Sequence, residues 1–160
     1  MSDALTPRDT PLREGDPAPD FTLKDQNKND WTLSAALAKG DVVLCFFPMA
    51  FSPVCSNEMK CVTEEMEKWS EKAQVVGISC DSFFALKAWA DQLGLKQPLL
   101  ADMHRRVNKA YGLYWEEMNI SKRGTFVITR GEGGRPTVKW AQARDTPQAM
   151  NFDEVLAHVG

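Results

Sequence analysis

Apolar residues that repeat at a fixed spacing predict the central elements of this chain. The run 41–48 is apolar at every position after its first, which is typical of a strand buried on both faces of a sheet. A helix is expected to begin close to Pro53. Its apolar positions, spaced by 4, 3, 4 and 3, lie on one face of a helix: Cys55, Met59, Val62, Met66 and Trp69.

Strands and helices alternate along the rest of the chain. The pattern predicts strands over residues 74–79, 98–101, 125–129 and 137–141, and helices over 34–40, 82–94, 103–111 and 152–159. Two short strands are expected around the polar turn at residues 26–30, and the last two strands flank a glycine-rich turn as a hairpin. This order predicts an α/β thioredoxin-like fold, with three α/β/α layers, a mixed central sheet and extra N-terminal strands.

The length of 160 residues fits one domain, which we expect to span residues 15–160. Residues 1–14 are rich in proline and charge and are predicted to form a flexible arm. No stretch approaches the roughly 18 apolar residues of a membrane span, so we expect a cytoplasmic protein. In a reducing compartment, its four cysteines are more typical of redox chemistry than of structural disulfides.

Composition narrows the classes of partner. The net charge of −3 provides no basic field for nucleic acid or for an anionic membrane surface. The only histidines are His104 and His158, and no two cysteines have the close spacing of a zinc site. We therefore expect neither a metal site nor a nucleic-acid or membrane partner.

The junction between the buried strand and the long helix carries the candidate chemistry. Cys55 falls in the first turn of that helix, where free backbone N–H groups and the helix dipole favour an anion such as a thiolate. Pro48 can roof a small pocket there. Ser52 can donate a hydroxyl to a bound oxygen, or can act as an ordinary N-cap.

These residues resemble the active-site pattern of the peroxiredoxin family, the alkyl hydroperoxide reductases and thiol-specific antioxidant proteins. The pattern is proline, three residues, threonine or serine, two residues, cysteine, and the serine variant is present here. Further similar segments extend the resemblance over about residues 15–159: Gly15–Phe21, Glu58, Val75–Ser82 and Ser121–Ile128.

The resemblance implies a cofactor-free thiol peroxidase that reduces hydrogen peroxide and organic hydroperoxides. Cys55 would attack the peroxide and become a sulfenic acid, and Arg123 would hold the thiolate and the peroxide. Ser52 would stabilise the leaving oxygen, and Glu58 would orient an arginine. The implied partners are a thiol reductant such as thioredoxin or glutaredoxin, and a second copy of the chain in a homodimer.

Several thiols could resolve the sulfenic acid. Cys80 is the first candidate, because it ends the strand beside that of the nucleophile. Cys61 is the second, although it lies six residues after Cys55 on a different helix face, and Cys45 is the third. An external thiol is the remaining alternative.

Two other functions compete with this interpretation. A thioredoxin-like disulfide reductase needs Cys-X-X-Cys, and the matching segment Ser52–Cys55 lacks the first sulfur. A redox sensor that uses the same cysteine to signal to a partner stays open. Catalytic turnover separates the sensor from the peroxidase.

Overall fold

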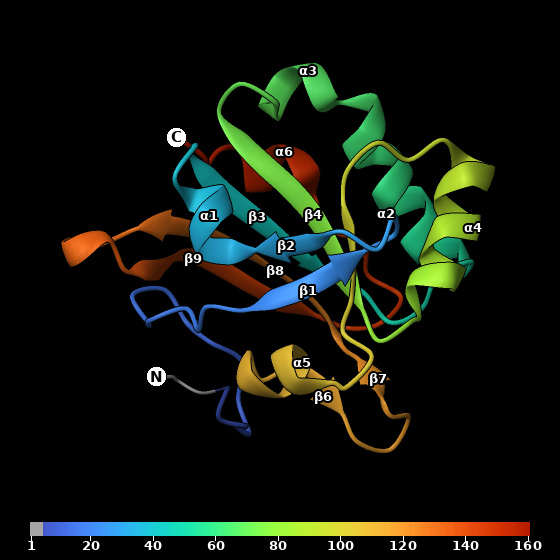
Figure 1. The fold of residues 1–160 in the computed structure, drawn as a ribbon, viewed down its shortest axis with the longest axis horizontal. Helices are drawn as coiled ribbons and strands as arrows, with labels where there is room; N and C mark the ends of the chain where they lie inside the picture. Colours follow the sequence, from blue (N-terminus) through green and yellow to red (C-terminus); the bar gives the residue numbers. More distant parts are fainter. Residues whose placement is uncertain (1–4) are drawn as a thin grey trace.

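The computed structural model describes residues 5–160, and Figure 1 shows a twisted sheet with helices on both faces. The strands are β1 (Thr22–Asp25), β2 (Asp30–Thr32), β3 (Asp41–Phe46), β4 (Ala73–Ser79), β5 (Leu99–Ala101), β6 (Tyr114–Trp115), β7 (Ile120–Ser121), β8 (Arg123–Arg130) and β9 (Pro136–Arg144). The helices are α1 (Leu33–Leu37), α2 (Pro53–Glu64), α3 (Met66–Trp69), α4 (Phe83–Leu93), α5 (Arg106–Ala110) and α6 (Phe152–Leu156), with a 3-10 turn at Glu132–Gly134.

The main sheet has the strand order β2-β1-β5-β4-β3-β8-β9. The buried strand β3 lies near its centre, parallel to β4 and antiparallel to β8. The added N-terminal strands β1 and β2 form one edge, and the β8–β9 hairpin forms the other. The predicted α/β fold with a mixed central sheet and extra N-terminal strands is therefore confirmed.

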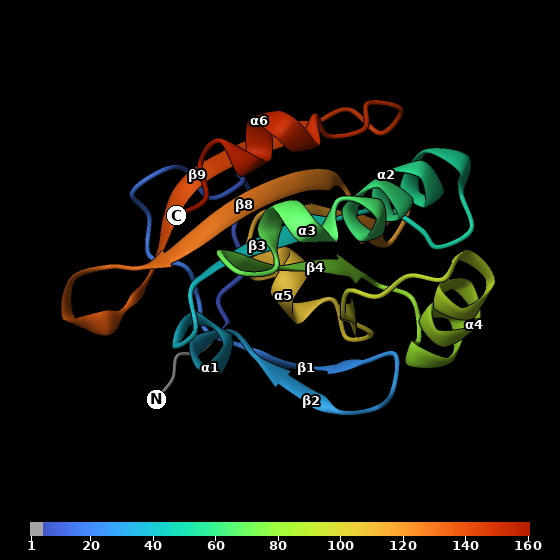
Figure 2. The same cartoon turned by 90° about the horizontal axis from the view of Figure 1, so that it is seen from above.

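Two apolar clusters make the three layers. The helices α2, α3, α4 and α6 pack on one face, and α1 and α5 pack on the other (Figure 2). Gly77 in β4 allows α2 to approach closely, since a Cβ there would lie 3.0 Å from Met59 Sδ and from Phe47. This contact sets the depth at which α2, and therefore its first turn, sits over the sheet.

The prediction of a single long helix through residue 69 is wrong, because the chain leaves helical geometry at Glu65 (φ −100°, ψ 18°). The Trp69 indole N–H donates to the Val62 carbonyl at 2.9 Å. In an unbroken helix that carbonyl would accept from Met66. A tertiary hydrogen bond thus replaces a helical one, and two helices result.

Other differences concern the ends of elements. Helices α5 and α6 are shorter than predicted, and β8 and β9 extend further, because backbone pairing continues past the apolar residues to Arg123 and Arg144. The short β6–β7 pair was not predicted, since its turn over residues 116–119 carries two glutamates and no hairpin signature.

The segment expected to be an arm lies partly outside the described residues. Its described part contacts the domain: the Arg8 N–H donates to the Lys109 carbonyl and the Leu12 N–H to the Tyr111 carbonyl, and Leu12 is buried. Residues 8–12 are thus held against α5 and the residue that follows it. Among the described residues, the structure contains no helix long and apolar enough to cross a membrane.

Candidate active site

The candidate site lies where β3 ends and α2 begins (Figure 1). It stands at the end of the sheet that is formed by the carboxyl ends of the parallel strands β3 and β4. Pro53 occupies the first turn of α2, where its missing N–H costs no hydrogen bond. Cys55 follows two residues later and has no exposed surface. The predicted position of this thiol in the first helical turn is therefore what the structure shows.

The loop between β3 and α2 is fixed from the next strand. The Ala50 N–H donates to the Asp81 carboxylate at 2.8 Å, and the same carboxylate accepts from the Ser79 hydroxyl at 2.7 Å. Phe51 adopts a left-handed backbone with φ 71°, which is uncommon for a bulky residue. This turn reverses the chain into α2, so Asp81 and Phe51 together set the course of the loop that precedes Cys55.

Arg123, Glu58 and Cys55 form one buried constellation. Arg123 Nη2 lies 3.2 Å from Cys55 Sγ, and Arg123 Nη1 donates to Glu58 Oε1 at 2.8 Å. All three side chains are almost completely shielded from solvent. Arg123 therefore places an N–H donor of a buried guanidinium directly against the sulfur of Cys55.

A second arginine, which the sequence interpretation missed, completes the network. Arg144 Nη2 lies 3.3 Å from Glu58 Oε2 and 3.0 Å from Thr125 Oγ1, and burial lowers the pKa of this guanidinium. In the hairpin register Arg144 is the direct partner of Arg123. Extending the predicted last strand by three residues, from 141 to 144, would have paired Arg144 with Arg123 and so identified it.

The segment after β9 closes the site. Its backbone carbonyls accept from both arginines, from Arg123 Nε at Thr146 (2.8 Å) and from Arg144 Nε at Gln148 (3.2 Å). The Met150 N–H then donates to Glu58 Oε2 at 2.7 Å. Residues 145–150 are thus held by hydrogen bonds to Arg123, Arg144 and Glu58, of which Arg123 contacts Cys55.

Pro48 and Ser52 flank the thiol loop, as the motif predicts. Pro48 is buried directly after the end of β3. Ser52 stands at the N-cap position, yet it makes no side-chain capping hydrogen bond, and its hydroxyl donates to the Met49 carbonyl at 3.0 Å. The capping role considered for the Ser52 side chain is therefore absent, and the hydroxyl stabilises the loop.

Cys80 lies away from Cys55. The sequence placed it correctly at the end of β4, but its thiol lies near Ser121 in β7 and near Asp102. These neighbours lie on the side of the sheet covered by α5, whereas Cys55 packs in the cluster under α2. For a disulfide to form between Cys55 and Cys80, one of the two sulfurs would have to move around the end of the sheet to its other face.

The other two thiols are no better placed. Cys61 is half-buried on α2, and residues six apart in a helix are separated by about 9 Å along its axis. A disulfide needs Cα atoms within roughly 7 Å. Cys45 shares the cluster of Cys55 but is fixed inside β3, with its sulfur 3.8 Å from Met150 Sδ.

Comparisons with known proteins agree with this geometry. Residues 14–132 match the model of the AhpC/TSA family. The chain is 38% identical over 122 residues to an alkyl hydroperoxide reductase E of Mycobacterium tuberculosis, covering 74% of this chain and 80% of that protein. It is 35% identical over 123 residues to peroxiredoxin TSA1 of Saccharomyces cerevisiae, covering 72% of this chain and 61% of that protein.

Among solved structures, the peroxidoxin BcpB of Mycobacterium tuberculosis superimposes with a TM-score of 0.81 at 29% identity, covering 92% of this chain and 96% of that one. The family match spans the strand, the loop and the helix that carry Cys55, and also β8 with Arg123. The chain therefore belongs to the AhpC/TSA family of peroxiredoxins and is a thiol-dependent peroxidase.

Proposed function

We propose that Cys55 is the peroxidatic nucleophile. Its thiolate attacks the distal oxygen of a hydroperoxide, an S–O bond forms and the O–O bond breaks. The sulfur becomes a sulfenic acid, and the leaving alkoxide or hydroxide takes up a proton to give an alcohol or water. The observation that carries this proposal is the 3.2 Å contact between Cys55 Sγ and Arg123 Nη2 inside a buried site.

Arg123 is the group that we expect to hold both reactants. Its Nη1 is committed to Glu58 and its Nε to the Thr146 carbonyl, so Nη2 is the nitrogen directed at the sulfur. A fixed guanidinium stabilises the thiolate before the reaction and the oxygen charge that develops during it. Glu58 positions the arginine and does not touch the substrate in this scheme.

The leaving oxygen needs donors as its charge develops. At the start of α2 the backbone N–H groups of Val54 and Cys55 have no helical acceptor, because they lie in the first turn of the helix. We assign these groups, and a Ser52 hydroxyl rotated away from Met49, to the leaving oxygen. Pro48 shields the pocket from water. Because Cys55 has no exposed surface, the peroxide reaches it when the segments that cover it move.

An external thiol is the reductant that the geometry favours. Cys80 points to the α5 side of the sheet, Cys61 lies beyond disulfide range along α2, and Cys45 is held inside β3. We therefore propose a one-cysteine cycle in which thioredoxin, glutaredoxin or a small thiol attacks the sulfenic acid. The four cysteines are all free, which fits a reducing compartment such as the cytoplasm.

Peptide mapping under non-reducing conditions tests this cycle. The wild-type chain, Cys80→Ser and Cys61→Ser each receive one equivalent of hydrogen peroxide and then an excess of glutathione. A Cys55–glutathione mixed disulfide in all three supports external reduction. A Cys55–Cys80 disulfide that forms before glutathione is added, and is absent in Cys80→Ser, would contradict it. Many peroxides consumed per chain would exclude the sensor alternative.

Organic hydroperoxides are the substrates that the pocket rim favours. Met49 and Phe51 are 42% and 50% exposed on the loop above Cys55, so an alkyl group has apolar surface to contact. The relative from Mycobacterium tuberculosis is named an alkyl hydroperoxide reductase. We expect cumene hydroperoxide to oxidise Cys55 faster than hydrogen peroxide does in stopped-flow fluorescence. Equal rate constants would argue against a contribution from the rim.

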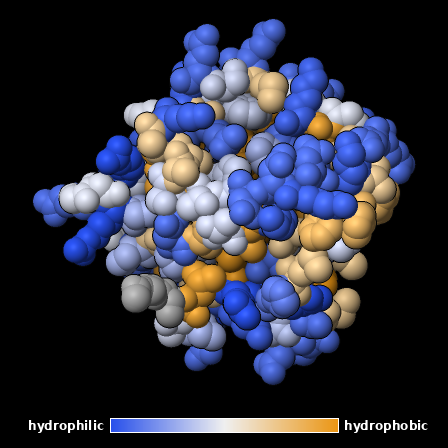
Figure 3. All heavy atoms as spheres, viewed as in Figure 1, coloured by the Kyte–Doolittle hydropathy of each residue, from blue (hydrophilic) through white to orange (hydrophobic). Residues whose placement is uncertain are grey.

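We also propose that two copies associate through this side of the molecule. Phe84, at the start of α4, is 64% exposed, and the Trp89 ring of the same helix lies 6.4 Å from the ring of Phe51, which is itself 50% exposed. Figure 3 shows apolar atoms gathered near the start of α4 in a mostly hydrophilic surface. Phe84→Ser should lower the dimer fraction in sedimentation velocity, with the exposed Lys60→Ala as control. A chain that is monomeric at high concentration would contradict this proposal.

A further inference from the structure

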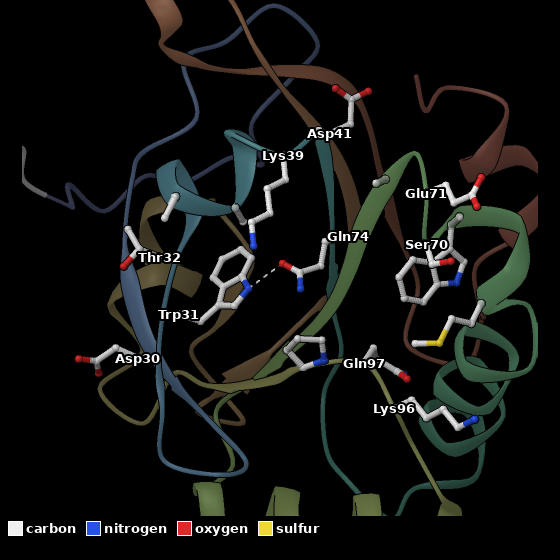
Figure 4. Close-up of a pocket in the computed structure, with 17 residues that line it drawn as sticks. Asp30, Trp31, Thr32, Lys39, Asp41, Ser70, Glu71, Gln74, Lys96 and Gln97 are labelled. Atoms are coloured by element: carbon white, nitrogen blue, oxygen red, sulfur yellow. Dashed lines mark hydrogen bonds between the residues drawn. The ribbon is translucent and has the colours of Figure 1, made fainter.

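An open cavity lies at the end of the sheet away from Cys55 (Figure 4). Its volume is about 650 Å³, within the range of cavities that hold small organic ligands. Asp41 and Ala73, the first residues of β3 and β4, belong to its lining, whereas the thiol loop follows the last residue of β3. The cavity is thus separated from the peroxidase site by the length of these strands.

The inner wall presents the side-chain amide of Gln74 as a fixed hydrogen-bond donor. The Trp31 indole N–H donates to Gln74 Oε1 at 2.9 Å, and Figure 4 shows the two side chains turned toward each other. Since an indole can only donate, this bond fixes the amide with its oxygen toward Trp31. Gln74 Nε2 then faces away from Trp31, and none of the residues from 5 to 160 accepts a hydrogen bond from it.

The charges around the cavity leave a positive excess. Two carboxylates of the lining already form ion pairs: Asp30 pairs with Lys24 at 2.7 Å, and Asp41 pairs with Lys139 at 3.3 Å. Two lysines of the lining, Lys39 and Lys96, form no ion pair in the described part of the chain, and Glu71 is the one acid of the lining that forms none there. In Figure 4 the Lys39 amine extends toward the Trp31–Gln74 pair.

The remaining lining is suited to an apolar ring. Trp31 in β2 and Trp69 in α3 contribute aromatic surface, and Ala36, Met66 and Pro98 contribute aliphatic surface. Aromatic side chains bind planar rings by stacking or by edge contacts. The cavity therefore combines an apolar lining with ammonium and amide donors concentrated near Lys39 and Gln74.

We propose that this cavity binds a small aromatic anion, a carboxylate or a phosphate ester whose ring packs on Trp31 and whose oxygens accept from Lys39 and Gln74. The charged oxygens would form charge-assisted hydrogen bonds with both donors. The proposal does not depend on the chemistry at Cys55, because no residue of the thiol loop lines the cavity.

Titration followed by two-dimensional NMR tests the site, with benzoate, phenyl phosphate and neutral benzamide as probes. Both anions should shift the Trp31 indole N–H and the Gln74 side-chain amide with saturable, millimolar or tighter binding. The relative affinities of the two anions identify the preferred head group. Shifts confined to Arg123 and Arg144, no saturation, or equal binding of benzamide would overturn the proposal.

Variants make the test specific. Gln74→Glu keeps an acceptor for the Trp31 indole but replaces the donor by a negative charge, and Lys39→Ala removes the ammonium. Each should weaken anion binding by about tenfold or more. Lys60→Ala removes an exposed lysine outside the cavity and should leave binding unchanged. Unchanged affinity in both Gln74→Glu and Lys39→Ala would refute the assignment even if a probe binds elsewhere.

Discussion

Glu58 Oε1 accepts from Arg123 Nη1 at 2.8 Å, and both side chains are almost fully buried. The second carboxylate oxygen of Glu58 accepts from Arg144 and from the Met150 N–H. One carboxylate therefore balances two buried guanidinium groups and fastens the segment after β9. This anchor and the Thr146 carbonyl hold the Arg123 guanidinium with Nη2 against Cys55.

Glu58→Gln should impair both catalysis and stability. The substitution keeps the shape of the side chain but leaves two buried cations without a counter-charge, which costs about 3 kcal/mol of unfolding free energy. The rate constant for peroxide reduction should fall at least about tenfold as Arg123 loses its orientation. Urea unfolding and stopped-flow kinetics measure the two effects. Glu64→Gln, at an exposed position of the same helix, is the control and should change neither.

Arg123→Lys should lower the rate constant while retaining a positive charge. A lysine cannot contact Glu58, the Thr146 carbonyl and Cys55 together, because its single nitrogen lacks the planar fork of a guanidinium. Loss of one such donor in a preorganised site costs about 10²–10³-fold in rate. Arg130→Lys, at the exposed end of the same strand, should keep the parental rate. A rate within twofold of the parent for Arg123→Lys would show that charge alone suffices.

Arg144→Lys should have a smaller effect of about tenfold on the same rate constant. Arg144 acts through Glu58 and Thr125 and makes no contact with Cys55 in the structure. Its loss should therefore change the rate at every pH by the same factor. A change confined to one side of the pH profile would instead indicate that Arg144 acts on the ionisation of the thiol.

The sequence was sufficient to predict the fold and the positions of the candidate site residues that lie close together along the chain. The apolar run of β3, the start of α2 close to Pro53 and the Pro48–Cys55 motif are local patterns, and each lies where it was predicted. Arg144 was missed because its position depends on the register of β8 and β9, which a β-bulge shifts between Val127 and Ile128. The direction of the Cys80 side chain also needs tertiary contacts, since Cys80 lies just beyond the last paired residue of β4.

Ser52→Ala should slow peroxide reduction by about tenfold, and Ser52→Thr should restore most of the rate. Removal of the hydroxyl takes away one donor for the leaving oxygen, whereas threonine keeps it. The hydroxyl donates to the Met49 carbonyl in the resting structure, so its loss also loosens the loop. Full activity of Ser52→Ala would leave the backbone N–H groups as the only donors in this step.

Cys80 should resist alkylation up to high pH. Burial, and secondarily the Asp102 carboxylate, raises the pKa of Cys80 to about 12. At pH 9 only about a thousandth of it would be thiolate, against about half for a thiol with the ordinary pKa of 9.0. Because folding favours the protonated thiol, its stabilising contribution is present below about pH 9 and is lost as pH rises toward 12.

Iodoacetamide labelling of the folded chain between pH 7 and pH 9, read out by mass spectrometry, checks this expectation. Cys61 is the internal reference, because burial and the nearby Glu65 raise its pKa while part of its surface stays exposed. Cys80 should therefore label more slowly than Cys61 throughout this range. Faster labelling of Cys80 would mean that its surroundings open readily. Cys80 would then again be a candidate for the thiol that resolves the sulfenic acid.

The central claim is that Cys55 is the residue oxidised by peroxide. The reduced chain receives one equivalent of cumene hydroperoxide in the presence of dimedone, which traps sulfenic acids, and peptide mass spectrometry then locates the label. The account predicts a single dimedone adduct on Cys55, no adduct in Cys55→Ser, and a much slower reaction in Arg123→Lys. An adduct on Cys45, Cys61 or Cys80 with Cys55 still reduced would contradict it.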